Sequence, residues 1–235
     1  MMPEATVEWA CAHSRWAYAH SSTPHEAQPQ SVPTGIPIPD IREQLFDAAE
    51  RVLLRNGPSA LTSRAVTTEA GVAKGILHRH FPDFDTFLAA LVLTHIEELD
   101  TRSHQLRASA GTKTVTHNLA GGLAAALDPI AVQLIGLVCA RQQLLARLRL
   151  TTPHGIPLAR EITKMIAAYL TAERGLGRIA LTADVDTVAI TLVGSAHLRA
   201  AGQDGVPLDP DDLSDILRTA IDRSLKGQPR KAARK

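Results

Sequence analysis

The segment GVAKGILHRHF, from Gly71 to Phe81, mixes glycine and basic side chains with apolar residues at the spacing of a buried helix. On a helical wheel the apolar residues share one side: Ala73, Leu77 and Phe81. The bare and cationic positions lie largely opposite: Lys74, Gly75, His78 and Arg79. Such a helix can dock its apolar side on neighbouring helices and place its cationic side in the major groove of DNA. A solvated surface on a small helical hairpin fits the same periodicity.

The residues before this segment begin with a longer helix. Asp40 and Glu43 have the spacing of an N-cap and its capping-box partner, and apolar residues then recur on one face to about residue 55. The tripeptide Asn56–Pro58 ends this helix, because its glycine suits a left-handed cap and its proline cannot continue a helix. The first helix is therefore expected over about 41–55.

Two short helices should follow. Thr62 is a good N-cap for a helix that ends at Gly71. The next helix is expected from Val72 to about Phe81, where Pro82 closes it. Two short helices with a glycine-containing turn between them, preceded by a longer helix, form a helix-turn-helix arrangement.

The remainder of the chain predicts helices throughout, separated by glycine, proline and aspartate signals, with no alternating strand pattern. The expected helices span about 84–108, 113–127, 130–149, 157–174, 183–201 and 210–226. The last two carry the clearest apolar stripes: Val185, Val188, Ala189, Leu192, Val193 and Ala196 in one, and Leu213, Ile216, Leu217, Ala220, Ile221 and Leu225 in the other. The chain is therefore expected to be all-α.

Composition sets wider bounds. A chain of 235 residues fits one large helical domain or a small and a medium one, and 45% hydrophobic residues suffice for burial. Two cysteines, Cys11 and Cys139, make neither a disulfide framework nor a zinc-ligand spacing, so a cytoplasmic location is the default. No export signal or apolar run of the ~18–20 residues needed for a membrane span is present, so we expect no membrane partner. The net charge of +1 decides nothing about nucleic acid, because a local basic face binds a duplex.

Four regions follow from these patterns. Residues 1–39 are rich in proline and polar side chains, which predicts a disordered or extended tail. Residues 40–83 are expected to form the helix-turn-helix domain, and residues 84–227 a larger helical domain. Residues 228–235 continue a basic terminus that can supply non-specific attraction to nucleic acid or remain a solvated tail.

From Ile41 to about Leu91 the chain resembles the DNA-binding domain of the tetracycline-repressor (TetR) family of transcriptional regulators. The matching stretches are IREQLFDAAERVLLRNG and LTSRAVTTEAGVAKGILHRHFPDFDTFLAAL. The family pattern has T-x-R, then A-G-V-[SA]-K-G-x-L-Y-x-[HY]-F, then P-x-K-[ED]-x-L. The resemblance implies an N-terminal three-helix DNA-binding domain followed by a larger helical domain for ligand binding and dimerisation.

Carried over by position, the resemblance implies a set of DNA contacts. Phosphate contacts are expected at the start of the second helix: Thr62, Ser63 and Arg64. Contacts to bases and nearby phosphates are expected along the third helix: Lys74, Gly75, Ile76, His78, Arg79 and His80. We expect Arg79 to contribute to base discrimination and Lys74 to backbone attraction, since guanine contacts discriminate and phosphate contacts mainly add affinity.

The chain departs from the family pattern at two positions. His78 stands where the family usually has tyrosine, and Phe84 where it usually has lysine. His78 can still donate a hydrogen bond to a phosphate, but Phe84 cannot. Residues 40–83 also carry six basic and six acidic side chains, so the attraction to DNA must be local.

The sequence gives no support for an enzyme or a metal protein. His78 and His80 are two residues apart, so a helix points them about 200° from each other and they cannot chelate one ion. Nucleophile-elbow, zinc-protease and phosphate-loop patterns are also missing from the sequence. We expect neither a cofactor nor a metal.

The larger helical region is expected to hold a small effector and to form a homodimer. After Phe87 its only aromatic residue is Tyr169, so a pocket should have mainly aliphatic walls and favour an aliphatic or amphipathic molecule. Five polar candidates are His117, Cys139, Gln142, Gln143 and Tyr169, of which Cys139 and Gln142 should share a helix face. The resemblance implies dimerisation through the helices near 183–201 and 210–226, with small residues at Gly194, Ser195 and Ala196.

These expectations define two hypotheses. In the first, a dimeric regulator, most simply a repressor, binds a palindromic operator and is released by a small molecule. The alternative is a helical small-molecule-binding or scaffolding protein whose DNA binding has weakened, as the residues at 78 and 84 suggest.

Overall fold

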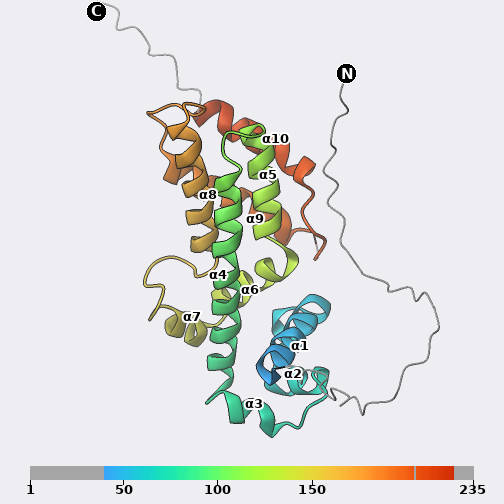
Figure 1. Cartoon of the computed structure of the whole chain (residues 1–235). Helices are drawn as coiled ribbons and strands as arrows, with labels where there is room; N and C mark the ends of the chain where they lie inside the picture. The colour runs from blue at the N-terminus through green and yellow to red at the C-terminus, as the bar shows by residue number, and fades with distance from the viewer. Residues whose placement is uncertain (1–39, 204, 225–235) are drawn as a thin grey trace, which may run out of the picture. The chain divides into compact units, whose positions relative to one another are not determined.

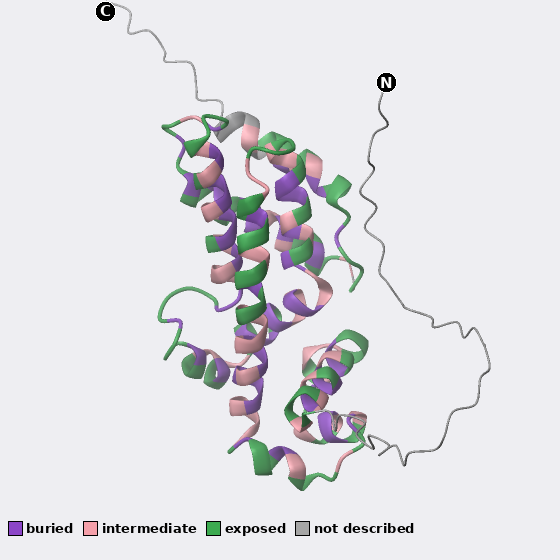
Figure 2. Cartoon of the chain, viewed as in Figure 1, coloured by how far each residue is buried: buried purple, intermediate pink, exposed green. Residues whose placement is uncertain are grey.

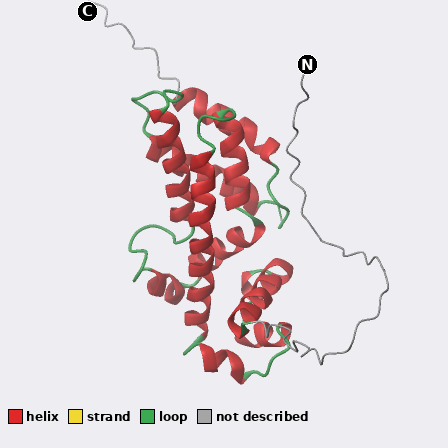
Figure 3. Cartoon of the chain, in the orientation of Figure 1, coloured by secondary structure: helices red, strands yellow, loops and turns green. Residues whose placement is uncertain are grey.

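The computed structural model describes residues 40–203 and 205–224, which belong to one compact unit. Every regular element in these two ranges is helical, as predicted (Figure 3). The predicted tails at 1–39 and 228–235, and the end of the final predicted helix beyond residue 224, lie outside the described residues. The predicted boundary between residues 83 and 84 remains a prediction.

The helix-turn-helix segment begins with α1 (Ile41–Asn56), a single 3-10 turn η1 (Pro58–Ala60) and α2 (Ser63–Glu69). The N-caps Asp40 and Thr62 are confirmed, whereas no hydrogen bond from Asp40 to Glu43 completes the predicted capping box. The Asp40 carboxylate accepts a hydrogen bond from the backbone N–H of Arg42 at 2.9 Å, and the Thr62 hydroxyl accepts one from Ala65 at 3.1 Å. Gly57, at φ 76°, ends α1 in a backbone conformation that favours glycine.

The third helix is shorter than predicted. α3 spans Gly75–His80 and does not begin at Val72. Gly71 is at φ 69°, and the N–H groups of Gly71 and Val72 donate to the carbonyls of Thr68 and Thr67, which closes α2 with a Schellman motif. Residues 72–74 complete this turn before a new helix can start. The placement of Ala73 on the buried side was therefore wrong, because Ala73 precedes the helix and is exposed.

Seven further helices complete the described part of the chain (Figure 1). They are α4 (Phe84–Ala108), α5 (Val115–Ala126), α6 (Pro129–Ala140), α7 (Gln142–Leu148), α8 (Ala159–Gly175), α9 (Val185–Ala201) and α10 (Pro210–Ser224). The long α4 packs against α8, α5 and α7, while α9 lies between α8 and α10 and α10 covers α5. The order and most boundaries agree with the predicted helices.

The predicted single helix over 130–149 is wrong. The chain breaks at Arg141, whose φ of −114° and ψ of 97° are extended, so α6 and α7 are separate helices. No glycine or proline marks this point. The break has a tertiary cause: α6 packs on α9 and α1, whereas α7 packs on α4, and the Arg141 side chain is held by Asp85 of α4 at 2.8 Å.

Four phenylalanines join α1, the end of α3 and the start of α4. The Phe81 and Phe87 rings meet edge to face at 5.2 Å, and Phe84 stacks on Phe87 at 5.6 Å. Phe46 of α1 lies 5.5 Å from Phe87. With Leu77, which is fully buried, this cluster anchors the apolar side of α3. Most of the other residues of α3 are exposed (Figure 2). Aromatic pairs of this geometry stabilise beyond the area they bury.

A buried polar cluster holds the C-terminal end of α8 in place. Glu173 is fully buried, and its carboxylate accepts hydrogen bonds from the Tyr169 hydroxyl at 2.5 Å and the Gly111 backbone N–H at 3.3 Å. Arg178 pairs with the same carboxylate at 3.2 Å and donates to the Lys113 carbonyl. Burial, together with the Glu173 hydrogen bond, raises the pKa of Tyr169. The cluster ties the loop between α4 and α5 to α8.

Within 40–203 and 205–224, no individual helix has both the length and the apolar character of a membrane span. Helices α5 and α6 reach that length and apolar character only when they are taken together, and they are bent by 62° relative to each other.

We predict that Leu77→Ala lowers the free energy of unfolding by about 2–5 kcal/mol, because a fully buried leucine leaves a cavity when it is truncated. Urea denaturation measures the change. Ile76→Ala is the matched control, since Ile76 is only half-buried and its truncation should cost clearly less. Equal losses in the two variants would contradict the burial of α3.

We also predict a pH-dependent link between α1 and α4. His95 of α4 lies 2.9 Å from the Glu50 carboxylate of α1. Burial opposes protonation, but the hydrogen bond and charge of Glu50, with Glu98 and Asp128, outweigh it and raise the pKa of His95 above 6.5. A raised histidine pKa gives stability that is complete below pH 6.5 and lost as the pH rises through the folded-state value.

The measurement compares the wild type with His95→Gln by urea unfolding at about pH 6 and about pH 8. The wild type should lose more stability than the variant between these two values. A larger loss in the variant would show that the ion pair does not form.

Candidate DNA-binding surface and helical pockets

The start of α2 presents the three predicted phosphate contacts at different depths. Thr62 and Arg64 are exposed, whereas Ser63 is half-buried. The Thr62 hydroxyl is used as the N-cap, and the Ser63 hydroxyl is buried with no hydrogen-bond partner among the described residues. Arg64 is therefore the freest of the three to reach a phosphate.

The outer face of α3 is open, as the sequence pattern requires. Most of its predicted contact residues are exposed: Lys74, Gly75, His78, Arg79 and His80. Ile76 is half-buried, and only Leu77 of the helix is buried. A Cβ added at Gly75 would meet no protein atom within 4 Å, so packing within the protein does not demand glycine there. A bare position that the fold does not need is suited to close approach by a partner.

The charges of the helix-turn-helix segment are unevenly distributed. Arg51 and Arg55 both pair with Glu69, and these hydrogen bonds lower the pKa of the Glu69 carboxyl. Arg64, Lys74 and Arg79 make no ion pair with any described residue. The balanced charge of residues 40–83 thus conceals a local excess of free cations on the exposed surface of α2 and α3.

Phe84, which stands at the position of the family lysine, belongs to the protein interior. Its ring is half-buried against Phe87, and the Arg141 guanidinium lies 5.6 Å from the ring centroid. The residue therefore strengthens the junction between α3 and α4 and offers no phosphate contact.

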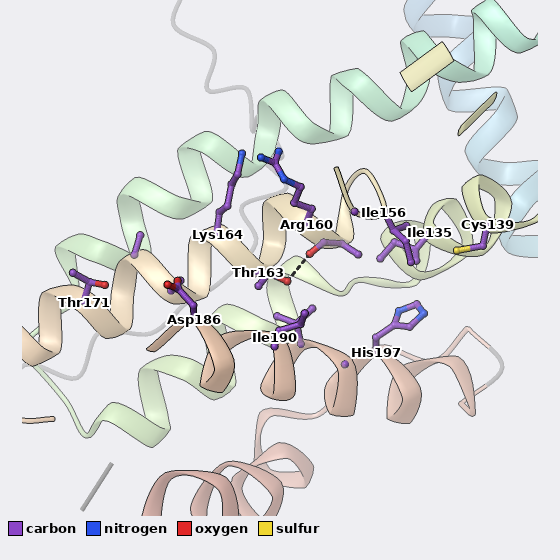
Figure 4. Close-up of a pocket in the computed structure, with 16 residues that line it drawn as sticks. Ile135, Cys139, Ile156, Arg160, Thr163, Lys164, Thr171, Asp186, Ile190 and His197 are labelled. Carbon is purple, nitrogen blue, oxygen red and sulfur yellow. Dashed lines mark hydrogen bonds between the residues drawn. The ribbon is translucent and has the colours of Figure 1, made fainter. Parts of the chain in front are cut away.

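A groove of about 750 Å³ runs between α8 and α9 (Figure 4). Its lining is mostly aliphatic and contains no phenylalanine, tyrosine or tryptophan. Ile190 and His197 rise from α9 toward α8, while Arg160 and Lys164 of α8 point away from α9. Both cations pair with Glu161, at 2.6 and 2.8 Å.

The predicted ligand residues do not converge on one site. Only Cys139 lines the groove, whereas His117 lines a second cavity of about 250 Å³ between α4, α5 and α8. Gln142 and Gln143 are exposed on α7, and Tyr169 is fully buried in its bond to Glu173. The prediction that Cys139 and Gln142 share a helix face was wrong, because the break at Arg141 places them on different helices.

Sequence reasoning missed the residues that define the two cavities. The groove depends on Ile156, Thr163, Ile190 and His197, and burial lowers the pKa of His197. The smaller cavity adds Arg102, Gln105 and Asn118 to apolar Leu106 and Met165. Small residues on the outer face of the helix over 157–174, such as Ala167 and Ala168, were the available signal for the groove.

Comparison with known proteins agrees with this architecture. Residues 45–91 match the sequence pattern of the family described as bacterial regulatory proteins, tetR family. No protein of curated function matches the chain.

Solved structures extend the likeness to the larger helical region. A transcriptional regulator from Rhodococcus sp. RHA1 is 22% identical, with a TM-score of 0.59 over 80% of this chain and 97% of its own. A TetR family member from Streptomyces coelicolor A3 is 25% identical, with a TM-score of 0.54 over 77% and 98%. The multidrug binding protein EbrR, solved with imidazole, is 21% identical, with a TM-score of 0.53 over 82% and 98%.

The matched segment covers the three helices that carry the exposed cationic face, and the shared fold covers most of the remaining helices. Residues 45–91 therefore carry the sequence pattern of the tetR family of bacterial regulatory proteins, and most of the chain has the fold of the solved TetR-like regulators.

Proposed function

We propose that this protein is a dimeric repressor that binds a palindromic operator and releases it when a small amphipathic molecule enters the helical region. The observation that carries the proposal is the open face of α3, where Lys74 and Arg79 are unpaired among the described residues beside the bare Gly75. Two such helices in a two-fold dimer would enter successive major grooves, roughly 34–36 Å apart.

Each exposed cation has a distinct expected role. Arg79 is exposed in the last turn of α3 and can reach a guanine edge with its planar guanidinium. Lys74, at the start of α3, and Arg64, on α2, are suited to phosphates on either side. His78 and His80 can add hydrogen bonds, and Gly75 and Ile76 can approach the duplex closely.

The groove between α8 and α9 is the proposed dimer interface. Sequence reasoning placed dimerisation on α9 and α10, but Leu213 and Leu217 of α10 are buried in the protomer's own core. The outer face of α9 instead leaves Ile190 63% exposed beside Gly194. Against it, α8 presents Ala167 and Ala168, whose small side chains allow close helix packing. The same face of a second copy would complete a four-helix interface.

The smaller cavity is the proposed effector site. It combines polar groups, including His117 and Asn118, with apolar Leu106 and Met165, which suits a small amphipathic molecule. EbrR, which shares the fold, was solved with imidazole and with malachite green. An effector that prefers a conformation with mis-spaced recognition helices weakens DNA binding by its differential affinity for that conformation.

For the DNA interface, we predict that Arg79→Ala weakens binding to a selected operator by about 1–3 kcal/mol and relaxes base preference. Lys74→Ala should weaken binding to all sequences and reduce the slope of log affinity against log salt by about 1. Fragments would be selected from the host genome with the wild type and then titrated with each variant by gel retardation.

Arg107→Ala is the matched control, since Arg107 is exposed in the last turn of α4, at the end of that helix away from α3, and should leave both quantities unchanged. If the wild type selects no fragment at low salt, the helical binding or scaffolding protein suggested by Phe84 and His78 becomes the better hypothesis.

For the dimer, we predict that Ile190→Glu raises the dimer dissociation constant by at least about tenfold, because two buried carboxylates would face an apolar groove. Sedimentation over a range of concentrations measures the constant. Leu150→Glu places the same charge at an 84% exposed leucine outside the groove and should have little effect. A dimer equally stable in both variants would refute the assignment of this face.

A further inference from the structure

The break between α6 and α7 places two arginines on the beginning of α4. Arg141, at the break, donates from both Nε and Nη2 to Asp85 Oδ1, at 3.1 and 2.8 Å. Arg147, in the last turn of α7, donates to the Asp83 carboxylate at 2.9 Å and to the Thr86 hydroxyl at 2.7 Å. All three acceptors lie within residues 83–86, the N-cap and first turn of α4.

Asp83 serves two elements at once. Its Oδ1 accepts the capping hydrogen bond from the Thr86 backbone N–H at 2.6 Å, and its Oδ2 accepts the bond from Arg147. The carboxylate that starts α4 is therefore also attached to α7. A shift of α7 would pull directly on the helix start.

The start of α4 lies next to the recognition helix in the chain. Only Phe81 and Pro82 separate the end of α3 from the N-cap Asp83. Phe81 is buried in the phenylalanine cluster with Phe84, over which the Arg141 guanidinium lies. The direction in which α4 begins thus determines the orientation of α3.

We propose that Arg141 and Arg147 are positioning residues for DNA recognition, which fix the start of α4 and thereby the orientation of α3 without contacting DNA themselves. The inference rests on the proposed DNA-binding function. The ion pairs are partly exposed, with the Arg141 and Arg147 side chains 36% and 41% accessible, so their effect on overall stability is small. Their effect on the geometry of the recognition helix is the property to measure.

We call Arg141 and Arg147, with their partners at the start of α4, the arginine clamp. The α6 helix connects this clamp to the groove. Ile135 and Cys139 of α6 line the groove, and Arg141 follows Cys139 by two residues. A molecule or subunit that packs in the groove therefore contacts the end of α6 that precedes Arg141. In the proposed dimer, the partner subunit would help to hold the clamp in place.

The test uses the full-length protein and an operator fragment selected by the wild type. The variants are Arg141→Gln, Arg147→Gln and the double variant. Arg149→Gln is the matched control, because Arg149 is exposed on the same segment, makes no ion pair with any described residue and removes the same charge. Operator affinity, affinity for unrelated DNA, the salt slope and the melting temperature are measured for each protein.

The expected result is a loss of operator affinity of about threefold for each single variant and about tenfold for the double, relative to Arg149→Gln. The salt slope and the affinity for unrelated DNA should match the control, because no phosphate contact has been removed. The melting temperature should change little. Lysine at both positions should restore part of the affinity, since it keeps the charge.

A mutant cycle with Asp85→Asn tests the mechanism from the other partner. Asp85 is not the capping residue, so its substitution leaves the N-cap of α4 intact. Arg141→Gln and Asp85→Asn should each weaken operator binding, and the combined variant should be no worse than either alone. If the double arginine variant fails to fold, this cycle still tests whether Arg141 acts on operator binding through Asp85.

Three outcomes would overturn the inference. First, the arginine variants could bind the operator as tightly as Arg149→Gln does. Second, they could lower the salt slope, which would make the arginines direct phosphate contacts. Third, the effects of Arg141→Gln and Asp85→Asn could be additive. Each requires a wild type that binds its operator selectively. A wild type that binds no operator contradicts the proposed function itself, which separates the two failures.

Discussion

The burial of Leu77 and Phe81 against α1 and α4 is the constraint on which the DNA-binding surface depends. α3 has six residues, fewer than an isolated helix needs to be stable in water, so its conformation must come from tertiary contacts. The phenylalanine cluster and the fully buried Leu77 supply them. Because the inner side is fixed, the opposite side is presented as a rigid surface of exposed cationic and imidazole side chains around a bare glycine.

Ion pairs within the protein explain how a segment with balanced charges, residues 40–83, can present a basic face. Two acidic residues of the helix-turn-helix segment form ion pairs within the protein: Glu69 with Arg51 and Arg55, and Glu50 with His95 on α4. Arg64 on α2, Lys74 before α3 and Arg79 on α3 have no acidic partner among the described residues. Net charge measures none of this, because a duplex responds to the local field within about a Debye length.

α4 is shared by the two functional regions. Its first turn is held by the phenylalanine cluster, Arg141 and Arg147, whereas its later turns pack against α5 and α8 and line the smaller cavity. A helix transmits displacement because its backbone hydrogen bonds make it stiff. Contacts at one end of α4 can therefore influence contacts at its other end.

Local sequence determined the elements that depend on local chemistry. Asp40, Gly57, Thr62 and Gly71 marked the ends of α1 and α2, because capping and positive φ are properties of a few adjacent residues. The cationic face of α3 was also predictable from its spacing, although the Schellman turn at Gly71 delayed its start to Gly75. The four phenylalanines could be counted but not placed in contact.

Only the tertiary structure decided what covers each apolar face. The predicted stripe of α9 is buried in the protomer, as are Leu213 and Leu217 of α10, whereas Ile190, outside the α9 stripe, stays exposed beside a groove. The break at Arg141 likewise has no local signal, since its partner Asp85 is 56 residues away and Arg147 and Asp83 are 64 apart. Periodicity identifies side chains that share a face, but long-range packing determines which surface meets that face.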